Sequence, residues 1–375
     1  MRRILAVAKK EFIHIRRDVR IVASVLIMPM LQLLLFSYAL STDVTNIPTA
    51  VVNQDNTQVS RQFVTGFERS NFFQVTQHLS SMDQVDGVFD RGEDKVIVVI
   101  RPGFGDAVAS GAKGPVAVLV DGSDPNAAQR AQGIATGLTQ IFGQKLLAQY
   151  MQVRGQDITA MGGIDQHLMT WYNPEGRSQF FLIPGLIVIL IMGTSIQQTA
   201  IALVKEKELG TMEQLVASPI RRLELMIGKV LPWALLAVTD VILITLFGVL
   251  VFQIPFRGSV LLFALASLLF VVGNLGLGLW ISSWASTINV ANQVSALLSM
   301  LPGFMLSGFI FSIRNMPPVL QLFTYVFPAR YYMTINRTLF LKGTGLDVLW
   351  PEFAALAAYA GLMLFLSAVT FKKRV

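Results

Sequence analysis

Few residues in this chain could perform catalysis. The 375-residue sequence contains no cysteine, which excludes thiol nucleophiles, disulfides and cysteine-ligated metals. Its three histidines, His14, His78 and His167, lie too far apart to predict a histidine-rich metal site. Asp121 and Asp124, in the sequence DGSD, have metal-ligand chemistry, but a turn after a strand uses the same residue types, and we predict a turn. The sequence therefore predicts neither a catalytic set nor a bound metal.

Glycine patterns give no nucleotide site either. The phosphate-binding pattern G-x-x-x-x-G-K-[ST] occurs nowhere in the sequence, so no ATP site is predicted in this chain. The stretch GNLGLG, Gly273–Gly278, follows no predicted strand. We therefore interpret it as a place where two helices pack closely rather than as a phosphate-binding loop.

The most informative charged stretch is KEKELGTMEQLVASP, residues 205–219, which lies between two strongly apolar segments. Gly210 is expected to break the preceding helix, and Thr211 can cap a new one with Gln214 at the capping-box position. Pro219 suits the first turn of a further helix. The resulting helix–break–helix would have an apolar edge and exposed acids (Met212, Leu215 and Val216; Glu206, Glu208 and Glu213). Such a rigid element can transmit displacement to a partner, whereas a solvated loop cannot, and the residues alone leave both interpretations open.

The elements around this stretch are those of a membrane protein. Hydrophobic residues make up 53% of the chain and charged residues 14%, against about 25% charged residues in soluble domains. A crossing needs roughly 20 mostly apolar residues. Six segments qualify: 21–41, 178–204, 230–252, 258–283, 287–313 and 350–371. A cleavable signal peptide is the alternative for the first, but its apolar run exceeds the 7–15 residues typical of such peptides. We predict a polytopic α-helical membrane protein with six transmembrane helices.

The distribution of charge predicts the orientation. Residues 1–20, 205–229 and 372–375 together carry fifteen basic and six acidic residues, whereas residues 42–177 carry ten basic and fourteen acidic ones. Because basic segments next to membrane spans stay inside the cell, both termini and the 205–229 loop are predicted to be cytoplasmic. The basic balance, with a pI near 9.7, is thus explained by the membrane, and no nucleic-acid partner is expected.

Residues 42–177 are too long for a loop and are predicted to form an extracytoplasmic α/β domain between the first two spans. Three Val/Ile runs followed by turn signals predict buried strands, within residues 49–55, 95–104 and 115–125. Polar helical stretches are expected at 57–70 and 81–91, and one long helix at 126–152.

The first 20 residues predict an amphipathic helix in the headgroup layer that leads into the first span. Apolar residues recur at helical spacing, and basic residues recur every seven positions on the other side (Leu5, Ala8, Phe12, Ile15 and Val19; Arg2, Lys9 and Arg16; Arg3, Lys10 and Arg17). A basic topology signal alone would explain the charges but not the apolar residues.

Several polar residues fall inside the predicted spans. Asp240 stands in the middle of the third, where a charge costs about 2.5–3.5 kcal/mol on insertion scales, so we expect it to face the bundle interior. We favour a structural role for it over a proton site. Other polar residues could line a substrate route or form interhelical hydrogen bonds; these are Gln197, Gln198, Asn274, Asn289, Asn292 and Gln293.

The stretch KEKELGTMEQLVASPIRRLELMIGK resembles the signature that follows the second span in permeases of bacterial ABC-2 type transporters. KKEFIHIRRD (residues 9–18), YNPEGRSQFFLIPG (172–185) and MLSGFIFSIRNMPPVLQLFTYVFPARYYMTINRTLFLKG (305–343) resemble other parts of the same family. The resemblance covers nearly the whole chain. Within the family, it looks most like the half-size inner-membrane permeases linked to multidrug efflux, although these motifs say almost nothing about substrate.

The resemblance implies an exporter subunit that acts with other chains. These would be two ATPase subunits that bind ATP and magnesium, a second permease chain (the same or a similar one), and, by family analogy alone, a periplasmic adaptor on the outer domain. The 205–229 loop would dock into the ATPase through Glu206, Glu208, Gly210, Thr211, Met212, Glu213 and Leu215. Residues 314–349 would form re-entrant or interfacial helices near the outer leaflet. The exported substrate would be lipophilic or amphiphilic and would leave across the bacterial inner membrane.

Two other functions are compatible with parts of this sequence. A proton-coupled secondary transporter would use Asp240 as its proton site, but that acid has no second intramembrane acid to work with. A membrane scaffold that transports nothing would use the outer domain to recruit partners, and it would purify without any ATPase.

Overall fold

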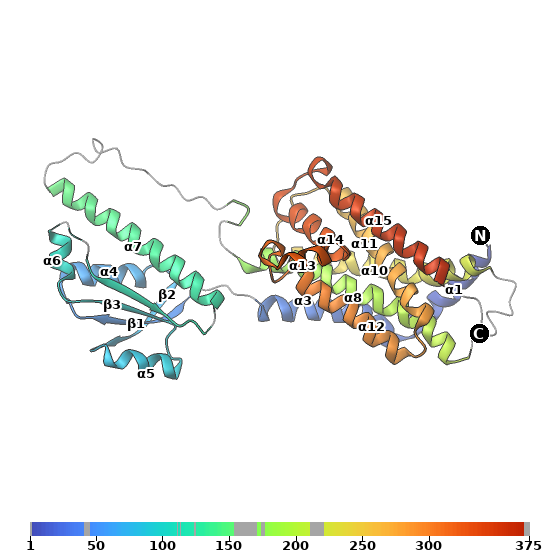
Figure 1. Cartoon of the computed structure of the whole chain (residues 1–375), viewed down its shortest axis with the longest axis horizontal. Coiled ribbons are helices and arrows are strands. Elements are labelled where there is room, and N and C mark those ends of the chain that lie inside the picture. The colour runs from blue at the N-terminus through green and yellow to red at the C-terminus, as the bar shows by residue number, and fades with distance from the viewer. Residues whose placement is uncertain are drawn as a thin grey trace. The chain divides into compact units, whose positions relative to one another are not determined.

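The computed structural model describes residues 2–40, 46–110, 112, 114–123, 125–153, 171–173, 177–210 and 221–370. The chain divides into two compact units (Figure 1). One consists of residues 1–41 with 170–375 and is helical; the other consists of residues 42–169 and contains a β-sheet.

The sheet unit is built on four strands in the order β2-β1-β3-β4. These are β1 (Ile47–Asn53), β2 (Phe73–Leu79), β3 (Val96–Ile100) and β4 (Val116–Val120). Strand β1 pairs in parallel with β2 and with β3, whereas β3 and β4 pair antiparallel. All five residues of β3 are buried, as expected of the Val/Ile run VIVVI in a central strand.

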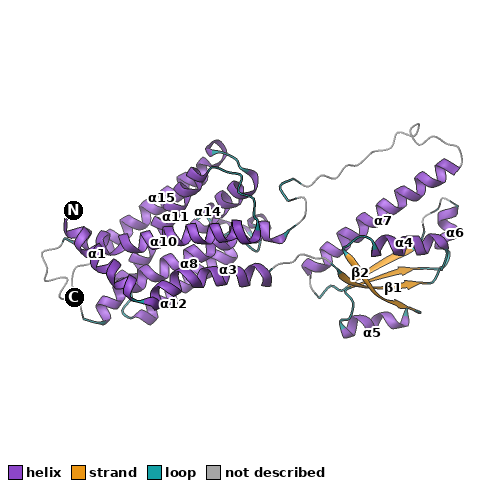
Figure 2. Ribbon diagram, turned by 180° about the vertical axis from the view of Figure 1, so that it is seen from behind, coloured by secondary structure: helices purple, strands orange, loops and turns teal. Residues whose placement is uncertain are grey.

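Helices cover both faces of this sheet, which makes it a three-layer α/β unit (Figure 2). Helix α5 (Asp83–Arg91) packs on one face through Val85 and Val88. Helices α4 (Gln58–Glu68), α6 (Phe104–Ala109) and α7 (Pro125–Val153) lie on the other. The Thr57 side chain caps α4 by accepting a hydrogen bond from the Ser60 amide at 3.2 Å.

The three predicted strands and the long helix are present, whereas β2 was not predicted. Only Phe73 of β2 is buried, because this strand lies at the edge of the sheet and its polar residues alternate toward solvent. The Asp121 carboxylate accepts a hydrogen bond from the Ser123 amide at 2.9 Å and pairs with Lys95 at 2.6 Å. Lys95 and these Ser123 contacts hold the pKa of the Asp121 carboxyl well below its usual range. The expected turn is therefore present, while Asp124 lies outside the described residues.

Among its described residues, the helical unit contains four helices long and apolar enough to cross a membrane: α8 (Ser178–Glu208), α10 (Arg222–Phe252), α11 (Val260–Trp284) and α15 (Leu346–Thr370). Ser259 caps α11 by accepting a hydrogen bond from the Leu262 amide at 3.5 Å. Most of α8 is buried, and it forms the centre of the unit.

The first and fifth predicted spans are helical but interrupted. The first is formed by α2 (Val19–Val22), a π-helical turn (Ala23–Ile27) and α3 (Met28–Ala39). The fifth is formed by α12 (Ile288–Leu301) and a second π-helical turn that begins at Pro302 and ends at Leu306, short of the predicted limit at residue 313. Proline lacks the amide that would continue the regular hydrogen-bond ladder, which explains the change of pitch at Pro302.

Short helices follow this point. They comprise a 3₁₀ turn (Ile313–Asn315), α13 (Pro318–Thr324), α14 (Pro328–Arg337) and a π-helical turn (Thr338–Lys342). The Arg337 guanidinium binds the free carbonyls of Gly308 and Phe309, at 2.9 and 3.2 Å. The Asn336 amide donates to the carbonyl of Pro184, in α8, at 3.0 Å. Side chains of α14 thus fasten the irregular backbone after α12 and join it to α8.

The glycines of GNLGLG let α11 approach its neighbours closely. A Cβ at Gly276 would lie 3.0–3.2 Å from atoms of Met363 and Leu364 in α15, and one at Gly278 would lie 2.7 Å from the Ile196 carbonyl in α8. The interpretation of this stretch as close helix packing is confirmed.

Helix α1 (Arg2–Arg17) packs against the start of α10, where a Cβ at Gly228 would lie 2.8 Å from the Cβ of Val7. Its predicted apolar residues divide between two surroundings. Ala8 and Ile15 are buried against the protein, whereas Leu5 and Phe12 are exposed. The exposed pair forms the apolar surface that an interfacial helix requires.

Candidate functional site

The charged stretch predicted from the sequence begins in the last turn of α8. That helix ends at Glu208, and Gly210 follows with a φ of 73°, a left-handed conformation that favours glycine. Thr211, Met212, Glu213 and Leu215 lie outside the described residues, so the structure bears on this prediction through Glu206, Lys207 and Glu208.

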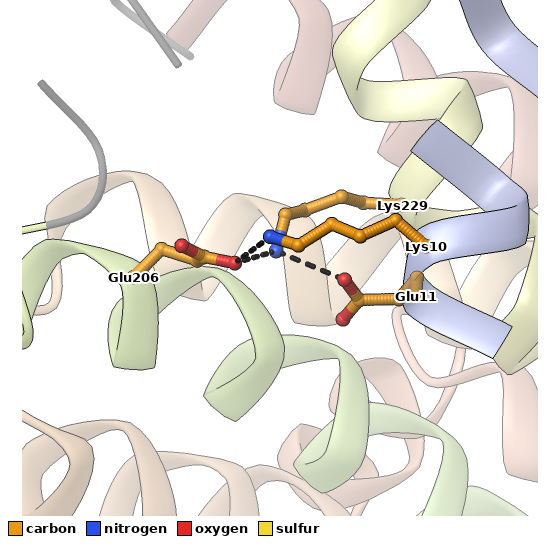
Figure 3. A network of polar contacts seen from close by, with 4 residues as sticks. All are labelled: Lys10, Glu11, Glu206 and Lys229. Atoms are coloured by element: carbon orange, nitrogen blue, oxygen red, sulfur yellow. Dashed lines mark hydrogen bonds and ion pairs between the residues drawn. The ribbon is translucent and has the colours of Figure 1, made fainter. Parts of the chain in front are cut away.

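Glu206 belongs to a network of four charged residues from three helices (Figure 3). Its Oε1 lies 2.7 Å from Lys229 Nζ in α10 and 3.4 Å from Lys10 Nζ in α1. Lys229 also contacts Glu11 Oε2, in α1, at 3.3 Å. The Lys229 and Glu11 side chains are 3% and 6% exposed, whereas that of Lys10 is 61% exposed. Lys229 thus sits between two carboxylates in a largely dry environment.

Burial determines how much each contact contributes. An exposed ion pair such as Lys10–Glu206 contributes about 0–1 kcal/mol. Removing one partner of a buried pair costs about 3–5 kcal/mol, because it leaves an uncompensated charge away from water. Lys229 is therefore the member of this network whose removal is expected to cost the most.

The next two residues bind the ends of two further helices. Lys207 Nζ donates to the carbonyls of Ser282 and Ser283 in the last turn of α11. Glu208 Oε2 accepts a hydrogen bond of 2.9 Å from the amide of Ile288, the first residue of α12. A cation at a helix C-terminus and an anion at an N-terminus both interact favourably with the helix dipole.

Glu206, Lys207 and Glu208, which we call the α8 clamp, therefore contact four other helices: α1, α10, α11 and α12. The chain leaves α8 just after the clamp and re-enters the bundle at α10. The contacts of the α8 clamp thus join these five helices near the end of α8.

Of the polar residues predicted inside the bundle, only some contact one another in the structure. Gln197 Nε2 donates to Asn292 Oδ1 at 2.8 Å, which joins α8 to α12. Gln198 lines a cavity of about 10 Å³, the room of roughly one water molecule. Asn274 is fully buried, and neither atom of its amide has a hydrogen-bond partner among the described residues.

Asp240 is also fully buried. Its Oδ2 accepts a hydrogen bond from Thr194 Oγ1, in α8, at 3.2 Å, while its Oδ1 has no partner among the described residues. Asp240 therefore faces the bundle interior, as expected of an intramembrane acid, and it joins α10 to α8.

Sequence reasoning missed the partners of Glu206, although one signal was available. Val7, Glu11 and Ile15 recur every four residues of α1 and are all buried. A carboxylate on an apolar helical face indicates a buried cation opposite. That cation is Lys229, which lies 218 positions from Glu11 in the sequence, and no local pattern identifies it.

Neither unit shows metal-site chemistry in the part of the chain that the structure describes, where no three His, Asp or Glu residues gather as ligands.

The chain is similar to known proteins over most or all of its length. A family described as ABC-2 family transporter protein matches residues 20–369. The probable multidrug ABC transporter permease YbhS of Escherichia coli K12 is 31% identical over 375 residues, covering 100% of this chain and 98% of its own. The probable multidrug ABC transporter permease YbhR of the same organism is 27% identical, covering 93% of this chain and 92% of its own. The E. coli K12 inner membrane transport permease YhhJ is 25% identical, covering 92% of this chain and 93% of its own.

Proposed function

Because this chain belongs to the ABC-2 transporter permease family, we propose that it is the membrane subunit of an ATP-driven exporter. A separate ATPase binds ATP and magnesium and supplies the work, since the sequence has no phosphate-binding loop. The substrate is lipophilic or amphiphilic, in keeping with the multidrug permease names of two relatives.

The observation that carries this proposal is the α8 clamp. Residues 205–229 dock on the ATPase through the loop between α8 and α10. Movement of the docked loop passes through Glu206 to α1 and α10, through Lys207 to α11, and through Glu208 to α12. Short charged contacts at the base of the loop make this connection stiff enough to reorient helices. Docking by Gly210, Thr211, Met212, Glu213 and Leu215 is part of the proposal.

The distribution of charge and hydropathy supports the proposed orientation of the chain in the membrane. Six crossings place the α/β unit outside the bacterial inner membrane and both termini in the cytoplasm, as the excess of basic residues requires. A second permease chain, identical or similar, completes the transport path, and a periplasmic adaptor binds the outer domain. Gln197, Gln198, Asp240, Asn274 and Asn292 are the candidates for lining the path.

Copurification tests the proposal. The full chain, expressed with an ABC ATPase subunit of the same organism, is expected to purify as a complex, and amphiphilic drugs are expected to change ATP hydrolysis in nanodiscs. Failure of any ATPase to associate would contradict the proposal.

A clamp variant separates docking from coupling. Changing Glu206, Lys207 and Glu208 together to glutamine is expected to leave the complex intact but to abolish the response of ATP hydrolysis to drugs. The matched control changes two acids of the sheet unit, Glu68→Gln with Glu93→Gln, and is expected to respond as the unmodified chain does.

A further inference from the structure

An apolar groove between α10 and α11 is unused by the proposed coupling mechanism. It encloses about 620 Å³, within the roughly 300–1,000 Å³ typical of sites for small molecules. Only two residues of its lining carry a polar side chain, Thr245 and Ser267. The Ser267 hydroxyl is already engaged with the Tyr332 hydroxyl at 2.7 Å and with the Phe263 carbonyl. The groove thus suits a hydrocarbon chain.

The length of the groove matches one leaflet of a bilayer. Along α10 it runs from Val238 to Val249, twelve residues whose eleven steps rise about 16 Å at about 1.5 Å each. The hydrocarbon core of a bilayer is about 30 Å thick. Since α10 and α11 are both long enough to cross the membrane, the groove extends from one surface to about the midplane.

The surface end of the groove lies beside two cations. Phe256 and Val260 line this end, and Arg257 between them is exposed. The Arg257 amide donates to the Phe340 carbonyl at 3.2 Å, and a Cβ at Gly343 would lie 2.8 Å from the Arg257 carbonyl. These contacts bring the exposed Lys342 to the same place.

Neither cation is neutralised there. Among the ion pairs of the described residues, none involves Arg257 or Lys342. The rings of Phe256, Phe263 and Phe340 pack edge to face at this end, with centroids 5.0–5.9 Å apart.

We propose that this groove binds one anionic phospholipid of the surrounding leaflet, with an acyl chain between α10 and α11 and its phosphate at Arg257 and Lys342. The apolar groove, one leaflet deep, complements the acyl chain of such a lipid, and the two cations at its surface end complement the negative charge of its headgroup. A neutral lipid would fill the groove but would offer the cations no net negative charge. The proposal does not depend on which side of the membrane this end of α10 faces.

Native mass spectrometry of the full chain in detergent tests the charge requirement. Phosphatidylglycerol is expected to bind more tightly than phosphatidylcholine with the same acyl chains. Arg257→Gln and Lys342→Gln are each expected to weaken phosphatidylglycerol binding about fivefold, since a cation near a membrane surface contributes about that factor. Arg314→Gln, which removes another exposed cation of the same unit, is expected to leave binding unchanged. Equal binding of the two lipids, or an equal effect of Arg314→Gln, would overturn the proposal.

A second pair of variants tests the groove itself. Ala264 is exposed and lines the groove, so Ala264→Phe fills it and is expected to abolish retention of the lipid. Ala358→Phe adds the same ring to the exposed surface of α15 and is expected to retain it. If Ala264→Phe retains the lipid, or if an exported drug rather than phosphatidylglycerol is displaced by filling the groove, the assignment is wrong.

Discussion

Two lysines that contact the same carboxylate oxygen show how strongly burial decides the role of a residue. Lys10 and Lys229 both lie within 3.4 Å of Glu206 Oε1, yet their side chains are 61% and 3% exposed. Water screens the first contact and not the second. Lys229, moreover, is the sole described cation that contacts Glu11.

Lys229→Met is therefore expected to destabilise the helical unit by about 3–5 kcal/mol, because Glu11 would remain buried without the cation that contacts it, whereas Glu206 would keep Lys10. Lys10→Met is expected to cost about 1 kcal/mol or less. Thermal unfolding of the purified chain in detergent checks both values. Equal shifts in melting temperature for the two variants would show that burial does not control this network.

Asp240 offers a test between an ATP-driven and a proton-driven exporter. Its carboxylate accepts from Thr194, and asparagine retains an oxygen that can do the same. If the role is structural, Asp240→Asn preserves ATP-driven efflux in inverted vesicles, and Asp240→Leu lowers the yield of folded protein. A proton-coupled transporter would instead lose transport in Asp240→Asn and upon collapse of the proton gradient.

At the scale of elements, α11 is positioned by glycines on two sides. Gly276 faces α15 and Gly278 faces α8, and in both places a side chain would meet backbone atoms of the neighbouring helix. Close approach of this kind is how helices gain packing energy in lipid, where the hydrophobic effect does not drive their association.

Gly276→Leu is expected to separate α11 from α15 and to lower the melting temperature by several degrees, since overpacking costs about 1–3 kcal/mol. Gly361→Leu is the matched control on α15, because no atom lies within 4 Å of a Cβ at that position. The melting temperatures of the two variants are measured in the same detergent. A larger decrease for Gly361→Leu than for Gly276→Leu would contradict this account of the helix contact.

At the scale of the whole molecule, the proposed function depends on the orientation of the chain in the membrane. The N-terminal helix α1, the end of α8 and the end of α15 lie at one end of the helical unit (Figure 1). These are the segments whose flanking residues carry the basic excess. The sheet unit lies in the sequence between the first two predicted spans, in the acidic part of the chain.

The cysteine-free chain makes the predicted topology directly measurable. In spheroplasts, a membrane-impermeant maleimide is expected to label Ser110→Cys in the sheet unit and to label Leu209→Cys only after permeabilisation. Both positions are exposed, so access to the reagent and not burial decides the result. The reverse pattern would invert the orientation and remove the proposed coupling.

Much of this organisation was predictable because it depends on local patterns. Hydropathy over 20 or more residues marks α8, α10, α11 and α15, and Val/Ile runs mark β1, β3 and β4. The edge strand β2 was not predicted, because its exposed polar residues alternate with half-buried ones and leave a weak apolar signal. The interruptions at 23–27 and 302–306 were not predicted; Pro302 marks the second of them in the sequence, but a proline alone does not distinguish a π-helical turn from a kink.

Apolar runs and strand patterns act over neighbouring residues, so they were enough to predict the membrane class and the separate α/β unit, and the quoted motifs were enough to indicate the family. The binding partners of the clamp residues, in contrast, become visible in the folded structure alone. Glu206 meets Lys229 and Lys10, Lys207 meets the end of α11, and Glu208 meets the start of α12. Ile288 lies 80 residues from Glu208, and Lys10 lies 196 residues from Glu206. Partners this far apart in the sequence are set by how the helices pack, and no local periodicity encodes them.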